Sequence, residues 1–128
     1  MAIARYREEN QVKWVGVRPG HNGEQVLVPI DLGASAIVYT VPADKLLLLF
    51  DWHLGIVRNV DVTARLEART DGAVVLAYLV QVSSNSADPG FSDSNNTFVP
   101  IELSAAYDLY VTTTTQVRGY IHGILIDV

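Results

Sequence analysis

Residues 59–82 read NVDVTARLEARTDGAVVLAYLVQV, and this stretch decides the fold. In its first half, small and apolar residues from Val60 to Ala68 occupy every second position, with polar or charged residues between them. A period of two is typical of a β-strand with one face on a core and the other in water. Asp71-Gly72 then interrupts the pattern, and this pair favours a hairpin because both residues tolerate positive φ. The stretch therefore predicts two antiparallel strands, Asn59–Arg69 and Ala73–Val82.

The rest of the chain repeats this pattern of short β-branched and aromatic runs separated by turn residues. No window shows a capped apolar period of 3.6 residues, so we expect no substantial helix. The fold class predicted is all-β, an antiparallel sandwich of about eight strands in one domain over residues 1–128, with residues 1–10 as an N-terminal arm or the lead into the first strand. The further predicted strands are Val12–Val17, Gln25–Pro29, Ala36–Val41, Lys45–Ile56, Thr97–Leu103, Tyr107–Thr114 and Val117–Asp127.

Composition restricts the classes of function. The net charge of −5 argues against nucleic acid or an anionic membrane surface as the main partner, because both need a basic patch. The longest apolar runs, residues 46–50 and 73–80, are far shorter than the roughly 18 residues of a membrane helix. With no cysteine, disulfides and thiolate metal sites are excluded. The first ten residues lack the apolar core of a secretory signal, so we expect a cytoplasmic protein, or a virion protein if the gene belongs to a phage.

Three predicted strands are apolar on both faces, which an isolated sandwich does not explain. They are Lys45–Ile56, Ala73–Val82 and Val117–Val128. Either the N-terminal segment covers the second apolar face or another copy of the chain does, and we favour a homo-oligomer, since large apolar patches mark interaction sites. The residues expected at this interface are Leu47, Leu49, Val74, Leu76, Tyr78, Val80, Tyr120, His122 and Ile124.

Residues that could carry chemistry are few. Strand alternation places Asp51 and His53 on one face, about 7 Å apart, where either a metal or acid–base pair or an ordinary structural contact is conceivable. The sequence lacks a nucleophile elbow, a phosphate loop and a zinc-binding histidine motif. We therefore expect no cofactor and no enzyme activity, with a cupin-like metalloenzyme as an alternative.

A polar, turn-rich segment at residues 83–96 is the longest predicted loop. Its candidate ligand-binding residues are Asp88, Phe91 and Asp93. The carboxylates would suit Ca²⁺, although their spacing does not match the calcium-loop pattern, and Phe91 could stack on a sugar ring. A carbohydrate-binding module, with Trp14 as a further aromatic, is therefore the first alternative function, and an ordinary solvated loop is the simpler interpretation.

The run Tyr39–Leu46, YTVPADKL, introduces a long apolar strand, and the segments Tyr107–Val111 and Val117–Gly123 close the chain. This succession over residues 36–128 resembles small jelly-roll domains of tailed-phage and related virion proteins. Asp44 stands where such turns usually have glycine. The resemblance implies a structural protein that decorates a capsid or forms part of a fibre or baseplate, commonly as a trimer. Its partners would be other particle proteins and a glycan, and the resemblance transfers no binding residues.

Overall fold

The structure is a computed structural model that describes residues 4–8, 11–15, 23–57, 61–84 and 92–128, with side chains for 23–57, 61–84 and 100–128. Every regular element in these ranges is a strand. The strands are β1 (Ala4–Glu8), β2 (Gln11–Val15), β3 (Glu24–Leu32), β4 (Ala36–Thr40), β5 (Lys45–Ile56), β6 (Val62–Arg69), β7 (Val75–Ser84), β8 (Ser92–Leu103), β9 (Asp108–Thr112) and β10 (Val117–Asp127).

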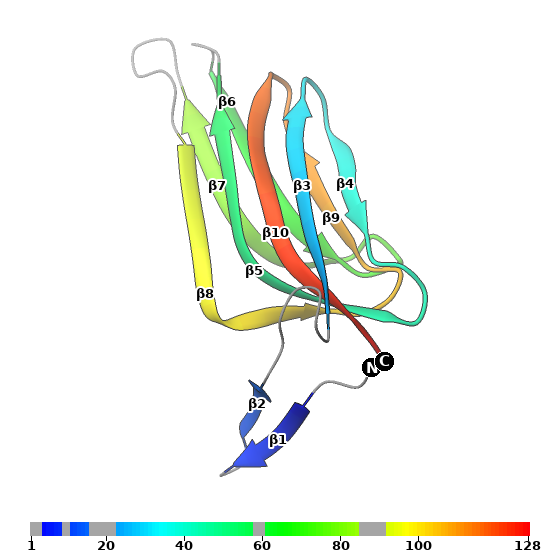
Figure 1. Cartoon of the computed structure of the whole chain (residues 1–128). Coiled ribbons are helices and arrows are strands. Elements are labelled where there is room, and N and C mark those ends of the chain that lie inside the picture. Colours follow the sequence, from blue (N-terminus) through cyan, green and yellow to red (C-terminus); the bar gives the residue numbers. More distant parts are fainter. Residues whose placement is uncertain (1–3, 9–10, 16–22, 58–60, 85–91) are drawn as a thin grey trace.

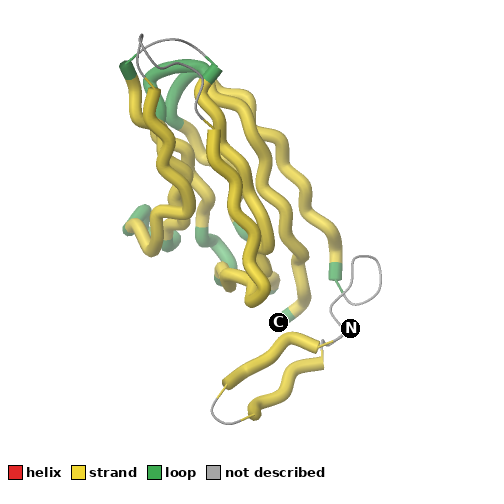
Figure 2. Tube along the Cα trace, turned by 90° about the vertical axis from the view of Figure 1, so that its left-hand side faces the viewer, coloured by secondary structure: helices red, strands yellow, loops and turns green. Residues whose placement is uncertain are grey.

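Two four-stranded antiparallel sheets form a sandwich (Figures 1 and 2). The first sheet has the order β3-β10-β5-β8 and the second has the order β4-β9-β6-β7, while β1 and β2 pair only with each other. Only β6 and β7 follow one another within a sheet, and the other connections from β3 to β10 cross between sheets. The predicted antiparallel sandwich is confirmed.

The strand pairs are nested. The β6–β7 hairpin is innermost, followed by the antiparallel pairs β5–β8, β4–β9 and β3–β10. The contacts of β10 with β5 and of β9 with β6 then close the two sheets. A long nested hairpin rolled into two sheets of four strands is the jelly-roll topology. The fold is therefore a jelly-roll β-sandwich, in agreement with the resemblance.

The main core lies between the sheets. Trp52 is its largest side chain, and its indole N–H donates to the carbonyl oxygen of Leu79 in the opposite sheet at 3.1 Å. This bond satisfies a polar group that would be costly to bury alone. The alternation of β6 is as predicted: Ala64, Leu66 and Ala68 are buried in this core.

In β5 the predicted assignment of faces is wrong for the first half of the strand. The alternation placed Leu47 and Leu49 on an interface, but both lie completely buried in the main core. A β-bulge is the reason: against β10 the register passes from Leu49 to Asp51, so Phe50 is the extra residue, and the pairing with β8 is interrupted at the same place. The bulge inverts the alternation, so odd-numbered residues face the core before it and even-numbered residues after it.

A similar irregularity moves Val80 of β7 into the core, where the prediction had placed it on the interface. Leu66 pairs with Val80 while Glu67 pairs with Tyr78, so Leu79 is an extra residue in β7. A second register shift follows between Ala68 and Arg69. The predicted loop at residues 83–96 is also too long, because β7 continues to Ser84 and β8 starts at Ser92.

Candidate functional site

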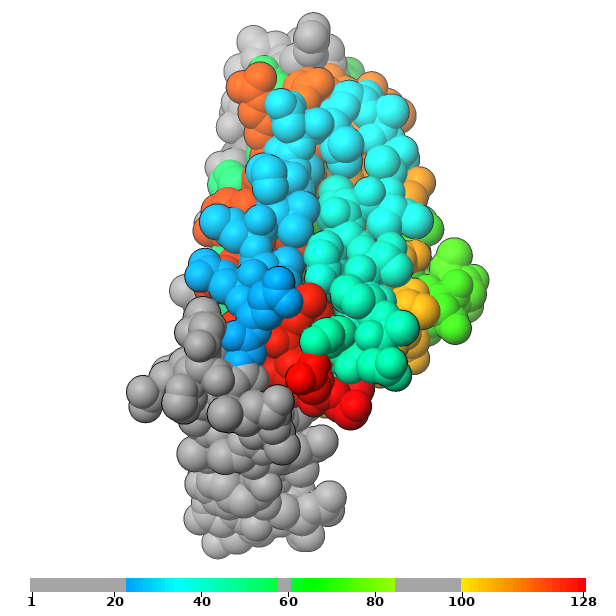
Figure 3. All heavy atoms as spheres, turned by 45° about the vertical axis from the view of Figure 1, so that its right-hand side comes forward, coloured from blue at the N-terminus to red at the C-terminus, as the bar shows by residue number. Residues whose placement is uncertain are grey.

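The tip of the β6–β7 hairpin is the most exposed apolar feature of the described surface. Val74 is 63 % exposed and Tyr78 is 60 % exposed, and Val75 and Leu76 between them are also exposed. In Figure 3 the green atoms of this hairpin project from the right-hand side of the molecule. We call Val74, Val75, Leu76 and Tyr78 the apolar strip.

Local sequence explains why this strip projects. The turn begins with a hydrogen bond from Ala73 N–H to the Thr70 carbonyl at 3.0 Å, and Ala73 itself has φ of 61°. The hairpin was predicted correctly, but the left-handed residue is Ala73, one position after the Asp-Gly pair. Successive bulges in β7 increase twist and bend the strand. Because β7 is an edge strand, the bent end has no neighbouring strand on its outer side.

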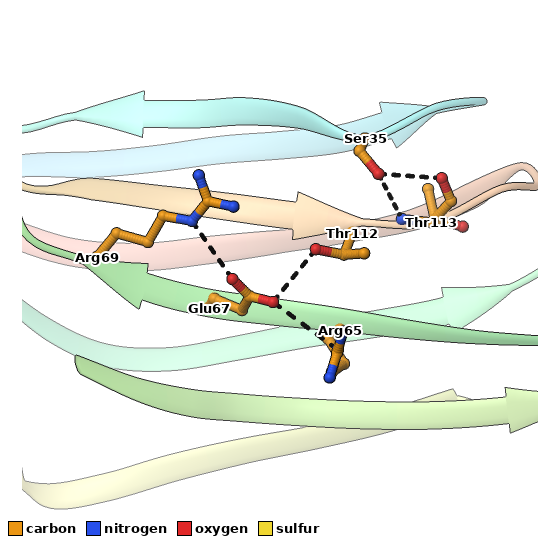
Figure 4. A network of polar contacts seen from close by, with 6 residues as sticks. All are labelled: Ser35, Arg65, Glu67, Arg69, Thr112 and Thr113. Atoms are coloured by element: carbon orange, nitrogen blue, oxygen red, sulfur yellow. Dashed lines mark hydrogen bonds and ion pairs between the residues drawn. The ribbon is translucent and has the colours of Figure 1, made fainter. Parts of the chain in front are cut away.

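Beside the strip, the outer face of the second sheet carries a charged cluster (Figure 4). Glu67 is only 4 % exposed although it points away from the main core. Its carboxylate accepts hydrogen bonds from Arg69 Nε at 3.3 Å and from the Thr112 hydroxyl at 3.2 Å, and Arg65 Nε lies 3.7 Å away. Each polar contact offsets part of the cost of burying the carboxylate.

Two tyrosines cover the arginines of this cluster. The Arg69 guanidinium lies 3.4 Å from the centre of the Tyr110 ring, and the Arg65 guanidinium lies 5.2 Å from the centre of the Tyr78 ring. Cation–π contacts of this kind hold a flexible guanidinium in one place. Tyr78 therefore joins the charged cluster to the apolar strip, and the two form one continuous surface. Sequence reasoning missed this cluster, although the alternation Arg-x-Glu-x-Arg was its signal.

The same view shows a second polar contact, at the residue that follows Thr112 and the end of β9. The Ser35 hydroxyl donates to the carbonyl oxygen of Thr113 at 3.1 Å and accepts from the Thr113 N–H at 2.9 Å (Figure 4). It fastens the segment before β4 to the end of β9. This contact stabilises the sheet and does not involve Glu67.

The outer face of the first sheet holds the predicted residues Tyr120 and His122. Tyr120 stacks on His53 with ring centroids 5.9 Å apart, and His122 Nδ1 lies 3.0 Å from Asp51 Oδ2. Asp51 and His53 do share a face, as predicted, but Asp51 contacts His122 across the strands. Among the described residues, no group of three histidine or acidic side chains is close enough to hold a metal ion.

Farther along the same face, Ile124 packs with Leu48 and Ile126 in a second apolar cluster, with Leu46 and Phe50 against it. We call these five residues the outer apolar cluster. Ile124 was among the predicted interface residues, and Leu46 and Leu48 were not. They occupy the positions that the alternation had assigned to Leu47 and Leu49.

The predicted ligand-binding residues cannot be placed as a site. Asp88 and Phe91 lie outside the described residues, and Asp93 lies in β8 at a position where only the backbone is described. Its backbone pairs with Leu54 of β5, so Asp93 is part of the first sheet. No helix in the described part of the chain is long and apolar enough to cross a bilayer.

No protein-family model and no curated protein matches this chain. Among solved structures, the chain is similar to a pentameric capsid protein isolated from metagenomic phage sequences, with 18 % identity, a TM-score of 0.42, and coverage of 79 % of this chain and 59 % of that one. It is also similar to a chain in the structure of infectious bursal disease virus, Gx strain, with 8 % identity, a TM-score of 0.42, and coverage of 97 % and 36 %. The chain thus spans little more than half, and about a third, of those proteins. The fold assignment itself rests on the strand pairing described above.

Proposed function

We propose that this protein is a structural, non-enzymatic component of a virion-type particle, a capsid decoration, fibre or baseplate protein, that associates with copies of itself. The observation that carries the proposal is the apolar strip beside the Glu67 cluster. Jelly rolls also occur in lectins and cupins, so the fold alone does not decide the function. The chemistry of the surface is the stronger argument.

This surface has the composition of a subunit interface. Tyrosine and arginine are enriched among the residues that contribute most to protein–protein binding, and Tyr78, Arg65 and Arg69 lie together here. Among the described strands none pairs with the outer edge of β7, so a strand of a neighbouring chain can add to the sheet there.

A second copy of the chain is the partner that we propose. The cluster carries two arginines for one glutamate, whereas the whole chain has a net charge of −5. An acidic neighbour of the same sequence therefore complements it. A trimer is the proposed assembly, with other particle proteins and a glycan as further partners, and with the virion as its location if a phage encodes it.

Size-exclusion chromatography with light scattering tests the proposal. We expect the wild-type protein at tens of micromolar to have a mass near three times the 14.0 kDa of one chain. Leu76→Asp and Tyr78→Asp should reduce the mass to that of one chain without changing the circular dichroism spectrum. Leu27→Asp is the matched control, because Leu27 is equally exposed on the first sheet. A monomeric wild type would contradict self-association, and loss of assembly only in Leu27→Asp would move the interface to the other sheet.

A further inference from the structure

Most hydrogen-bond donors of Arg65 and Arg69 are unused within the chain. Arg69 donates to the Glu67 carboxylate from Nε, and the shortest contact of Arg65 with that carboxylate, 3.7 Å, is also through Nε. Each guanidinium has four further N–H groups on its terminal nitrogens, and none of them donates a hydrogen bond within the described part of the chain. In Figure 4 the terminal nitrogens of Arg69 are turned away from Glu67. Both arginines can therefore bind a carboxylate of another molecule, in the two-bond geometry that suits a guanidinium.

Arg65 and Arg69 are held in place before any partner binds. The rings of Tyr78 and Tyr110 lie against them, while 36 % and 20 % of their side-chain surface stays exposed. Groups that are ordered in advance lose less conformational entropy on binding. Because β6 pairs with β9 without a bulge, the Cα atoms of the two arginines lie roughly 14 Å apart. The surface thus offers two fixed positive groups at a defined separation.

At one end of the sandwich, three segments bring acidic side chains together. In Figure 3 the red end of β10 lies between the blue start of β3 and the blue-green turn between β4 and β5. Lys45 forms an ion pair with Asp127, and this contact, together with the negative charges of Glu24 and Asp44, raises the pKa of Lys45. We call Glu24 and Asp44 the acidic pair.

The carboxylates of the acidic pair have no committed partner among the described side chains. Glu24 and Asp44 are exposed, and neither side chain forms an ion pair or a hydrogen bond with another described residue. By contrast, Asp31, Asp51 and Asp108 all have polar partners within the chain. The acidic pair is therefore available to a positive group on a neighbouring molecule.

The separation within the acidic pair is similar to that between the two arginines. Glu24 lies opposite Leu125 and Lys45 lies opposite Asp127, on the two sides of β10. Strand geometry then places the Cα atoms of Glu24 and Lys45 roughly 12 Å apart, and Asp44 directly precedes Lys45. Two carboxylates at this separation can each contact one of two arginines.

Apolar residues accompany the charges on both surfaces. Pro42 and Ala43, in the turn between β4 and β5, are exposed directly before Asp44. On the other surface, Tyr78 joins the arginines to the apolar strip. The two surfaces therefore match in their apolar parts as well as in their charges.

We propose that the acidic pair of one copy of the chain binds Arg65 and Arg69 of the next copy, with the β4–β5 turn packed on the apolar strip. This inference rests on the proposed self-association and names the second half of that interface. The two surfaces lie on different parts of the subunit, so the contact is head-to-tail. Contacts of this kind build a ring when the rotation between neighbours closes, and a trimer is a ring of three.

Sedimentation velocity of the full chain over a range of concentrations tests this contact. Glu24→Gln with Asp44→Asn removes both charges, and asparagine tolerates the positive φ of Asp44. We expect self-association weaker on the order of tenfold, because two charge pairs are lost, with an unchanged circular dichroism spectrum. Asp31→Asn with Glu102→Gln removes the same number of exposed charges from the first sheet and should assemble like wild type. Arg65→Lys keeps the charge but removes the fork, and should weaken association to a smaller extent.

Mixing two variants tests whether the contact is head-to-tail. A Leu76→Asp chain keeps its acidic pair, and the Glu24→Gln, Asp44→Asn chain keeps its arginines and apolar strip. At a concentration where each variant alone is monomeric, we expect the mixture to form a species of two chains and nothing larger, because only one contact is intact.

The outcomes separate this inference from the proposed function. If wild type assembles while the Glu24→Gln, Asp44→Asn chain associates equally well, the acidic pair is not the partner surface and the inference is wrong, although self-association stands. An equal loss in the Asp31→Asn, Glu102→Gln control, or a mixture without the two-chain species, would also overturn it. A wild type that stays monomeric at every concentration would overturn both the inference and the proposed self-association.

Discussion

The outer faces of both sheets carry apolar side chains, which are buried on the first sheet and exposed on the second. Each carries more apolar surface than a free sandwich needs. On the first sheet, Leu48 and Ile126 are fully covered, whereas on the second sheet Val74, Leu76 and Tyr78 remain exposed. A strand that is apolar on both faces therefore does not by itself indicate an interface between subunits, because apolar side chains on its outer face can be buried within a single chain.

The position of each patch explains the difference. The outer apolar cluster involves β5 and β10, which are inner strands of the first sheet, and the chain enters β3 directly beside it. The apolar strip lies on an edge strand at the far tip of a hairpin. The first patch is buried within the chain, and the second is the exposed patch that we propose to contact another copy.

Matched truncations in the two patches should give the largest contrast. Leu48→Ala is expected to destabilise the fold by about 2–5 kcal/mol, because it leaves a cavity in a fully buried cluster. Leu76→Ala should change the stability of the separated subunit by less than about 0.5 kcal/mol, because its side chain is already in water. Urea unfolding at low protein concentration measures both. Equal losses of unfolding free energy would show that Leu48 and Leu76 are buried to the same degree.

The middle of the outer face of the second sheet carries the charged cluster around Glu67 in place of an apolar cluster. Glu67→Gln tests this difference. The substitution keeps the shape of the side chain but removes the negative charge between Arg65 and Arg69. We expect a loss of about 1–3 kcal/mol, typical of a buried polar group that loses a charged partner. Thr112→Val is a milder control that removes one hydrogen bond. If Glu67→Gln leaves the free energy of unfolding unchanged, water replaces the carboxylate as the hydrogen-bond partner of the two arginines.

The smallest effect is expected at the exposed ion pair between Lys45 of β5 and Asp127 of β10. Hydrogen bonding to Lys45 lowers the pKa of Asp127, so this pair stabilises the fold above the ordinary carboxyl pKa and loses that contribution as pH falls through the lowered value. Asp127 raises the pKa of Lys45, so the contribution is also lost as pH rises through that raised value. Both groups are exposed, and solvent weakens the pair.

Melting temperatures of Lys45→Met and wild type should therefore differ slightly between about pH 5 and 9 and converge in strong acid. High salt should remove the same difference at neutral pH, because an exposed pair is screened. A difference that persists in acid and in salt would assign the role of Lys45 to packing of its aliphatic stem.

The sequence predicted the fold well because alternation and turn residues are local signals. The strands of the β6–β7 hairpin and the inward residues of β6 follow directly from them. The faces of β5 could not be predicted on both sides of Phe50, and the residues before it face opposite to the prediction. A bulge depends on how two partner strands align and leaves no mark in the strand itself. A register shift in β7 likewise explains why Val80 lies in the core and not on the predicted interface.

The predicted interface residues differ in their exposure, and their role at an interface stays a prediction. Val74, Leu76 and Tyr78 are exposed as an interface requires, whereas Leu47, Leu49 and Val80 are not. The buried state of Glu67 was not foreseen, because a glutamate on the polar face of a strand is normally solvated. It became buried through Tyr78 and Tyr110, which come from the strands on either side. Such cross-strand neighbours depend on sheet order, which alternation alone does not define.

The pairing of β3 with β10 also has a consequence for synthesis of the protein. Residues 24–32 pair with residues 117–125, nearly at the other end of the chain, and β10 lies between β3 and β5 in the sheet. A ribosome releases β10 after the other three strands of the first sheet, so this sheet stays split until residues 117–127 have emerged. Contacts so distant in sequence slow folding, and the nascent chain must keep its unpaired strands apart from those of its neighbours in the meantime.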